Sequence, residues 1–200
     1  MSSRDAILAS IRANLPQLDR PLPPVPRFDE CSPARLLAAF KEALERMGGV
    51  FLDPPAEGDP LQPVHDKLAG AKVVCSTVPE VVGNFDIAGV VAPRQLCDVD
   101  IAVVRASFAV AETGSVLLSE ADLHVNAVAY LAQHLIVLLD PADLVVNIHH
   151  AYARPEFRHY HYASFHTGPS ATADIEGVLI HGAQGVRSLS VLPIARTLTA

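Results

Sequence analysis

The chain has 200 residues, half of them hydrophobic and 18% charged, which is enough apolar material for one sizeable core but hardly for two. A formal net charge of -7 leaves no basic excess to neutralise a phosphate backbone, so the composition argues against nucleic-acid binding. The most apolar stretch, 125–139, is interrupted by Asn126, Gln133 and His134 and therefore predicts buried core instead of membrane insertion.

The amino-terminal residues predict a short amphipathic helix followed by an extended arm. Ser2 and Asp5 form a capping signature, and Ile7, Leu8, Ile11 and Leu15 then recur at helical spacing. Arg4, Asp5 and Arg12 interrupt any continuous apolar segment of the kind that a secretory signal needs, so we expect a cytoplasmic protein. Five prolines between 16 and 26 favour polyproline geometry. We therefore expect residues 1–31 to form a helix and a proline-rich arm, and residues 32–200 to form one α/β domain.

The remainder of the chain alternates helical and strand patterns. Ser32 and Pro33 predict the start of a helix that Gly48 and Gly49 end, and its apolar stripe consists of Leu36, Leu37, Phe40, Leu44 and Met47. Further helices are predicted at 63–68, 141–152 and 174–180. Strands are predicted at 50–52, 73–74, 87–91, 101–104, 108–111, 116–118, 134–139, 160–165 and 189–194, the last closing the sheet. The fold class is thus α/β, with an open mixed sheet flanked by helices.

Two segments carry candidate binding chemistry. In the first, Glu112, Thr113, Gly114 and Ser115 form a glycine turn between two apolar strands. Such a turn can present amides and hydroxyls to an anion, with Glu112 as a candidate base or nucleophile. The same pattern also fits a hairpin turn whose polar residues contact only water.

The second segment passes from a strand into a predicted helix. Its candidate ligand-binding residues are Gly168, Pro169, Ser170, Thr172 and Asp174. A glycine loop at a helix start directs free amides and the positive end of the helix dipole at one point, which favours an anion. An ordinary capped helix, whose dipole Asp174 and Glu176 already complement, explains the pattern equally well.

The run from Gly168 through Glu176, together with the Glu112-Thr113-Gly114 turn, resembles the signature of LUD-domain proteins of the lactate utilization protein C type. The opening helix and the proline arm are also similar to that family, so the resemblance covers nearly the whole chain. It implies a fold like that of the ribose-phosphate isomerase and CoA-transferase superfamily. It also implies an accessory role in oxidising L-lactate to pyruvate, alongside separate iron–sulfur subunits.

Three positions depart from the family pattern. Ala171 stands where arginine usually follows the Gly-Pro-Ser motif, which removes a guanidinium that could clamp a carboxylate. Gln184 and Val186 stand where the family commonly has histidine and proline, so a candidate acid or base is absent. These changes leave open whether the chain has catalytic activity of its own.

Other residue types suggest weaker candidates. Cys31, Cys75 and Cys97 are too few for an iron–sulfur cluster, which normally takes four thiolates, so no intrinsic cofactor is expected. His159 and His161 would share one face of a strand, but no acid or cysteine accompanies them at a ligand spacing, and no metal site is predicted. The arginines that could meet a substrate carboxylate, or simply form salt bridges, are Arg94, Arg105, Arg154 and Arg158. Tyr160 and Tyr162 indicate strand packing.

The two segments lead to one hypothesis. We expect the turn at 112–115 and the loop at 168–174 to converge at the carboxyl ends of adjacent strands and to bind a small anionic metabolite. One alternative is a stand-alone enzyme in which Glu112 acts on a thioester or a nucleotide-like substrate. Another is a pure assembly factor whose arm docks on partner proteins, and homo-oligomerisation is compatible with each.

Overall fold

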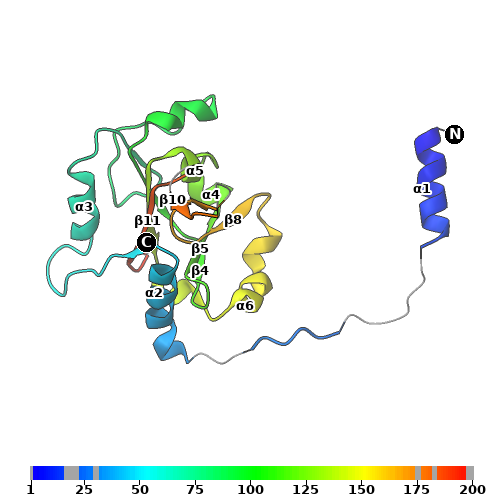
Figure 1. Cartoon of the computed structure of the whole chain (residues 1–200), viewed down its shortest axis with the longest axis horizontal. Helices are drawn as coiled ribbons and strands as arrows, with labels where there is room; N and C mark the ends of the chain where they lie inside the picture. Colours follow the sequence, from blue (N-terminus) through cyan, green and yellow to red (C-terminus); the bar gives the residue numbers. More distant parts are fainter. Residues whose placement is uncertain (1, 16–22, 29–31, 174–176, 182–183, 197–200) are drawn as a thin grey trace.

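The computed structural model describes residues 2–15, 23–28, 32–173, 177–181 and 184–196 (Figure 1). Its main feature is a parallel sheet in the order β1-β11-β6-β3-β2. The strands are β1 (Val50–Phe51), β11 (Ser188–Pro193), β6 (His134–Leu139), β3 (Ile101–Arg105) and β2 (Val74–Ser76). β11 lies inside this sheet between β1 and β6, so the prediction that the last strand closes the sheet is wrong. No helix in the described part of the chain is long and apolar enough to cross a membrane.

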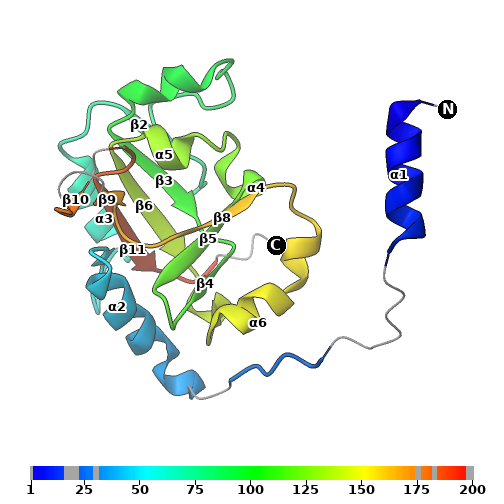
Figure 2. The same cartoon turned by 45° about the vertical axis from the view of Figure 1, so that its right-hand side comes forward.

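A second, mixed sheet packs beside the parallel one (Figure 2). Its order is β7-β4-β5-β8, with bounds Leu144–Val145, Phe108–Val110, Ser115–Ser119 and Ala163–His166. β5 pairs antiparallel with both β4 and β8, whereas β7 runs parallel to β4. Two short strands, β9 (Ala171–Thr172) and β10 (Ile180–His181), form a separate antiparallel pair. The predicted α/β class with a flanked sheet is therefore confirmed, as two sheets.

The layers stack in the order α3 (Gln62–Leu68), parallel sheet, mixed sheet, α6 (Ile148–Ala153), and α3 and α6 lie at opposite sides in Figure 1. The side chains of β6, which point alternately to the two faces of the parallel sheet, explain this order. Val137 faces the core between the sheets, and Ile136 faces the core under α3. Strands buried on both faces read as continuous apolar runs, as this one does.

Helix α2 (Leu36–Arg46) closes one side of the core between the sheets. It follows the 3-10 turn η1 (Pro33–Arg35), and it buries Phe40, Ala43 and Leu44. The predicted apolar stripe is correct except at its end, because Met47 lies beyond the helix and is 52% exposed. The smaller helices of this layer are α4 (Glu120–Leu123) and α5 (Val128–Leu131), and the other 3-10 turns are η2 (Pro93–Asp98), η3 (Pro141–Asp143) and η4 (Pro155–Arg158).

Helix α1 (Ser3–Ala13) lies apart from the rest of the chain in both views (Figures 1 and 2). The predicted capping box is present, because the Ser2 hydroxyl accepts from the Asp5 amide and the Asp5 carboxylate accepts from the Ser2 amide. None of its residues is buried, and Ile7, Ile11 and the following Leu15 are each more than half exposed. The apolar stripe of α1 thus faces solvent.

Two further predicted elements, at 87–91 and 141–152, are wrong, the first for a local reason and the second through pairing with a distant strand. The apolar run 87–91 forms a turn instead of a strand, because the Asp86 carboxylate accepts from the Ala88 amide and the Val90 amide donates to Ile87. The run 141–152 contains η3, β7 and α6 instead of one helix. Here the β-branched Val145 pairs with β4, and the Asn147 side chain caps a new helix by accepting from the amides of His149 and His150.

Candidate functional site

The first predicted segment forms the turn between β4 and β5. Gly114 has a φ of 66° and donates its amide to the Val110 carbonyl, which closes the turn. Glu112 is exposed, and its carboxylate accepts from the Ile148 amide at 3.3 Å. Thr113 is partly buried, and its hydroxyl lies 2.8 Å from that of buried Ser115. In this turn Glu112 therefore presents the accessible carboxylate, while the hydroxyls turn inward.

The second predicted segment follows β8 and is held by the residues just before β11. The Ser170 amide donates to the Val186 carbonyl, and the Ser170 hydroxyl donates to the Gln184 carbonyl, each at 2.9 Å. Thr172 lies in β9 and pairs with Ile180 in β10. The predicted helix at 174–180 is therefore wrong at its end, and Asp174 lies outside the described residues. Because Thr172 and Ile180 pair as strands, the structure does not support the helix whose dipole was expected to attract an anion.

The two segments meet in space. β5 pairs with β8 so that Val116 lies opposite His166, and this register places the Ser115 and Thr167 hydroxyls in hydrogen-bond contact. Thr113 extends the contact to a chain of three hydroxyls. The convergence that the sequence predicted is thus present, through strands that are adjacent in the mixed sheet.

Both motif glycines pack against the end of α2 instead of opening toward a ligand. A Cβ on Gly114 would lie 2.2 Å from the Leu44 backbone nitrogen. A Cβ on Gly168, whose φ is 67°, would lie 2.2 Å from the Met47 carbonyl oxygen. These positions need glycine because the backbone of α2 and of Met47 approaches them closely. At these two glycines the backbone that was expected to present amides to an anion is therefore covered.

The position of the segments relative to the strand ends differs from the expectation. They follow the carboxyl ends of β4 and β8, but β5 separates these two strands, and all three belong to the mixed sheet. Relative to the parallel sheet, Ser170 is bonded to Val186, which precedes the amino end of β11. The rule that ligands gather at the carboxyl ends of a parallel sheet therefore does not apply to this pair of motifs.

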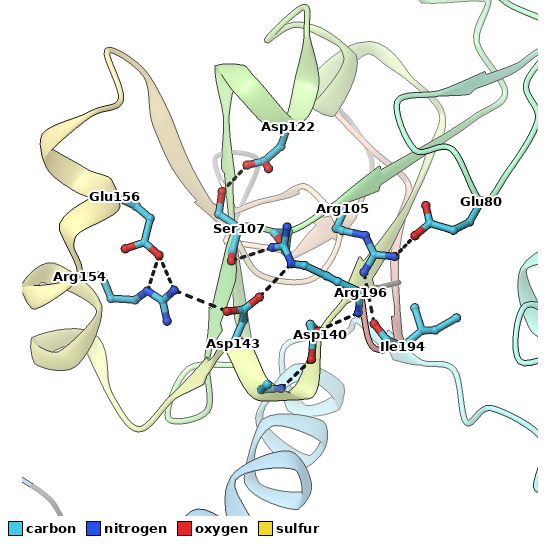
Figure 3. A network of polar contacts seen from close by, with 12 residues as sticks. Glu80, Arg105, Ser107, Asp122, Asp140, Asp143, Arg154, Glu156, Ile194 and Arg196 are labelled. Atoms are coloured by element: carbon cyan, nitrogen blue, oxygen red, sulfur yellow. Dashed lines mark hydrogen bonds and ion pairs between the residues drawn. The ribbon is translucent and has the colours of Figure 1, made fainter. Parts of the chain in front are cut away.

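Polar side chains at the carboxyl ends of the parallel strands bind one another (Figure 3). Arg105, which ends β3, binds Glu80 at 2.5 Å and donates to the carbonyl of Ile194 after β11. Arg196 binds Asp143 at 3.1 Å and the carbonyls of Ala106 and Ser107, and its amide donates to Asp140 after β6. Arg154 pairs with Glu156 and Asp143. Salt bridges, the second of the two interpretations, thus account for Arg105 and Arg154.

A cavity of about 620 Å³ opens on the outer side of the Glu112 turn. Its walls come from α2, the residues before α2, the turn, and the start of α6. The lining residues are Phe28, Ser32, Arg35, Ala38, Ala39, Glu42, Ala111, Glu112, Val146 and Asn147. Sequence reasoning found Glu112 but not Arg35, because Arg35 shows only as an ordinary residue at a helix start. The described part of the lining thus holds one cation and two carboxylates.

The end of the proline arm forms one wall of the cavity. The buried Asn147 side chain donates to the carbonyls of Arg27 and Phe28 at 2.7 and 2.9 Å, and the Phe28 ring lies 5.2 Å from that of His149. Because Asn147 also caps α6, a single side chain fixes both the arm and the helix that faces Glu112.

A cluster of polar aromatic residues lies beside the second segment. The Tyr130 hydroxyl contacts that of Tyr162 at 2.5 Å and donates to Ser164 at 3.0 Å, and Ser164 lies 2.8 Å from Nε2 of His166. Burial lowers the pKa of His166 to about 4, so the imidazole is neutral near pH 7. Burial also raises the pKa of Tyr130. Sequence reasoning assigned Tyr162 to packing and missed this network, because its members come from α5, from β8 and from Tyr162 just before β8.

The histidines do not form a metal site in the described part of the chain, where no group of three or more potential ligands is found. His159 and His161 lie between η4 and β8, so their expected placement on one strand face is wrong. His159 instead contacts the Pro155 carbonyl through Nδ1. Cys75 is buried, and burial raises the pKa of its thiol to about 11, which disfavours the reactive thiolate.

Comparison with known families identifies the domain. The model of the LUD domain matches residues 38–193, which run from α2 to the end of β11. The chain belongs to the LUD domain family. The LUD domain of this chain is also similar to a crystal structure of a DUF162 family protein from Deinococcus radiodurans, with a TM-score of 0.57 and 18% identity over 80% of this chain and 97% of that one. At this identity the likeness concerns the fold. No curated protein matches the chain.

Two of the residues that depart from the family pattern still make the backbone contacts that hold the loop at Ser170 in this LUD domain. Gln184 and Val186 hold Ser170 through their carbonyls, which a change of side chain leaves intact. Val186 is also buried in the core between the sheets. Ala171 is exposed at the start of β9. The loop is therefore held by contacts that do not depend on a histidine at position 184.

Proposed function

We propose that this chain is an accessory component of a lactate utilization system, and that the cavity beside Glu112 binds a small 2-hydroxy monocarboxylate such as L-lactate. Membership of the LUD domain family supports the system. The choice of ligand rests on one observation, that Arg35 and Glu112 line the same cavity. A guanidinium suits a carboxylate, and a carboxylate accepts from a hydroxyl.

The charges of the cavity favour this ligand over a more acidic one. Among the described lining residues, Glu42 and Glu112 contribute two negative charges against one positive charge on Arg35. A dianion would leave a charge without a partner, whereas a monoanion that donates one hydroxyl hydrogen satisfies both Arg35 and Glu112. Pyruvate lacks that hydroxyl, so the proposal predicts weaker binding of pyruvate than of L-lactate.

Oxidation of lactate to pyruvate releases two electrons and two protons, so it needs an acceptor. We place the acceptor in separate iron–sulfur subunits, because three cysteines in this chain fall short of the four thiolates that a cluster normally takes. The exposed apolar stripe of α1, formed by Ile7, Ile11 and Leu15, is the surface that we assign to docking on these subunits.

Calorimetric titration of the purified chain with L-lactate and pyruvate tests the ligand. We expect Glu112→Gln and Arg35→Gln to weaken L-lactate binding by about tenfold or more. Arg46→Gln is the matched control, because Arg46 is exposed on α2 and does not line the cavity. Equal affinities in Arg35→Gln and Arg46→Gln would overturn the assignment of the cavity.

Removal of residues 1–26 tests the docking surface. This deletion keeps Arg27 and Phe28, whose carbonyls bind Asn147, so the cavity wall remains. We expect loss of binding to purified iron–sulfur subunits with unchanged L-lactate affinity, and the same result from Ile7→Ser combined with Ile11→Ser. Arg12→Gln serves as the control on α1. Undiminished subunit binding after the deletion would refute this part of the proposal.

A further inference from the structure

A second cleft lies at the amino ends of the parallel strands, on the face that α3 covers. It consists of two adjoining cavities of about 420 and 220 Å³, which share Lys67, Ile101 and His134. The outer cavity is also lined by Gly70, Ala71, Lys72, Asp100, Gln133 and Arg187, and the inner one by Ile136, Ser188 and Ser190. None of these residues lines the Glu112 cavity.

The charge of this cleft is opposite to that of the chain. Lys67, Lys72 and Arg187 are exposed cations in the wall, in a protein with a formal net charge of -7. Asp100 is the acid of the described lining, and its carboxylate already accepts from the amides of Lys72 and Val73 at 2.7 and 2.9 Å. These amides lower the pKa of Asp100, which therefore stays ionised. The lining is left with an excess of two positive charges.

The sheet itself gives the cleft a polar floor. Parallel register places Ile101, His134 and Ser188 side by side on neighbouring strands. Ser190 lies two residues further along β11, on the same face of the sheet as Ser188. Nδ1 of His134 lies 2.8 Å from the Ser188 hydroxyl, which orients the imidazole and leaves Nε2 for another partner. Ser190 is 1% exposed. Two serines on an inward face are unusual for a parallel sheet, whose strands are otherwise apolar.

From this cavity, its charge and its polar floor, we infer that the cleft formed by Lys67, Lys72, His134 and Arg187 binds a small dianion, such as a phosphate group or a dicarboxylate. An excess of two positive charges matches a dianion, and lysine serves well as a point charge for phosphate. His134 and Ser188 supply hydrogen bonds beneath the cations. The site is separate from the Glu112 cavity, whose charges favour a monoanion.

Calorimetric titration with inorganic phosphate and, in a second arm, with malonate tests this site at constant ionic strength. We expect one saturable site per chain with a dissociation constant below roughly 10 mM for at least one of the two anions. Tighter binding of phosphate assigns a phosphate group, and tighter binding of malonate assigns a dicarboxylate. Absence of saturable binding in both arms would overturn the inference.

Substitutions locate the binding. Arg187→Gln and Lys67→Gln should each weaken anion binding by about fivefold or more, whereas Arg158→Gln, which removes another exposed charge from η4, should have no effect. Unfolding midpoints confirm that each variant is folded, and L-lactate affinity at the Glu112 cavity should stay unchanged in all three. If Arg187→Gln and Arg158→Gln weaken phosphate equally, the attraction is general and the site is refuted.

Discussion

Ser115 and Thr167 lie 52 residues apart in the chain, and their side-chain hydroxyls share one hydrogen bond. This bond joins the two segments that carry the sequence motifs. Glu112 lines the cavity, whereas Ser115 and Thr167 are not among its described lining residues. We therefore assign the hydroxyl chain to holding the turn in place, and Glu112 to contact with the ligand.

A double-mutant cycle measures this link. Ser115→Ala and Thr167→Val should each cost about 1–3 kcal/mol in the free energy of unfolding. Ser115→Ala leaves the half-buried Thr167 hydroxyl without this partner, and Thr167→Val removes one of the two hydroxyls that contact the buried Ser115. The double variant should cost less than the sum, with a coupling of about 1 kcal/mol in urea denaturation. The control pairs Ser115→Ala with Thr77→Val, whose hydroxyl binds the Asp122 carbonyl. Additivity in both cycles would contradict the bond.

The motif glycines provide the second prediction. Gly114→Ala and Gly168→Ala should each cost about 2 kcal/mol more than Gly58→Ala, measured by urea denaturation. Gly58 is the matched control because its φ of 96° is also positive, but a Cβ there meets nothing within 4 Å. The cost in excess of that at Gly58 measures the clash with α2 alone, because the strain of a positive φ is present at Gly58 as well. Equal costs at Gly58 and Gly114 would mean that α2 does not pack on the turn.

The third prediction concerns acid stability. The folded pKa of His166, about 4, lies below its ordinary value of 6.5, so between these values the unfolded chain binds the extra proton. Stability should therefore fall as pH drops from 6.5 to 4, by at most about 3 kcal/mol from this group. His166→Gln should flatten this part of the curve, and His161→Gln, an exposed histidine, should leave it unchanged. Identical curves for both variants would contradict the burial of His166.

The fourth prediction concerns the ends of the parallel strands. Arg196→Gln should cost about 1–2 kcal/mol in the free energy of unfolding, because it removes charge-assisted bonds to Asp143 and to the carbonyls of Ala106 and Ser107. The partial exposure of Arg196 keeps the cost modest. Arg94→Gln, at an exposed position in η2, should cost less than about 0.5 kcal/mol. Equal unfolding midpoints would show that this network does not hold the strand ends together.

Local patterns predicted the elements whose buried residues follow a regular spacing. β6 is buried on both faces and shows a continuous apolar run, and α2 is buried on one face and shows an apolar stripe at helical spacing. The run 87–91 misled because the Asx turn at Asp86 prevents an extended strand. The run 141–152 misled because the pairing of β7 with β4 depends on a partner more than 30 residues away in the chain.

The candidate site could be predicted only in part for the same reason. Glu112 and Ser170 were recognisable from motifs, and the convergence of their two segments was expected from the rule that ligands gather at strand ends. Of the two residues, Glu112 lines the cavity and Ser170 is not among its described lining residues. Arg35 was not, because its relation to Glu112 depends on how α2 lies across the turn. The helix expected after Thr172 was wrong because Ile180 returns to pair with this strand.

The most direct measurement is a crystal structure of the full chain soaked with L-lactate. The proposed function predicts the lactate carboxylate on the Arg35 guanidinium and its hydroxyl within hydrogen-bond distance of the Glu112 carboxylate. Lactate bound instead at the cleft of Lys67 and Arg187, or absence of lactate from the Glu112 cavity at saturating concentration, would contradict the account.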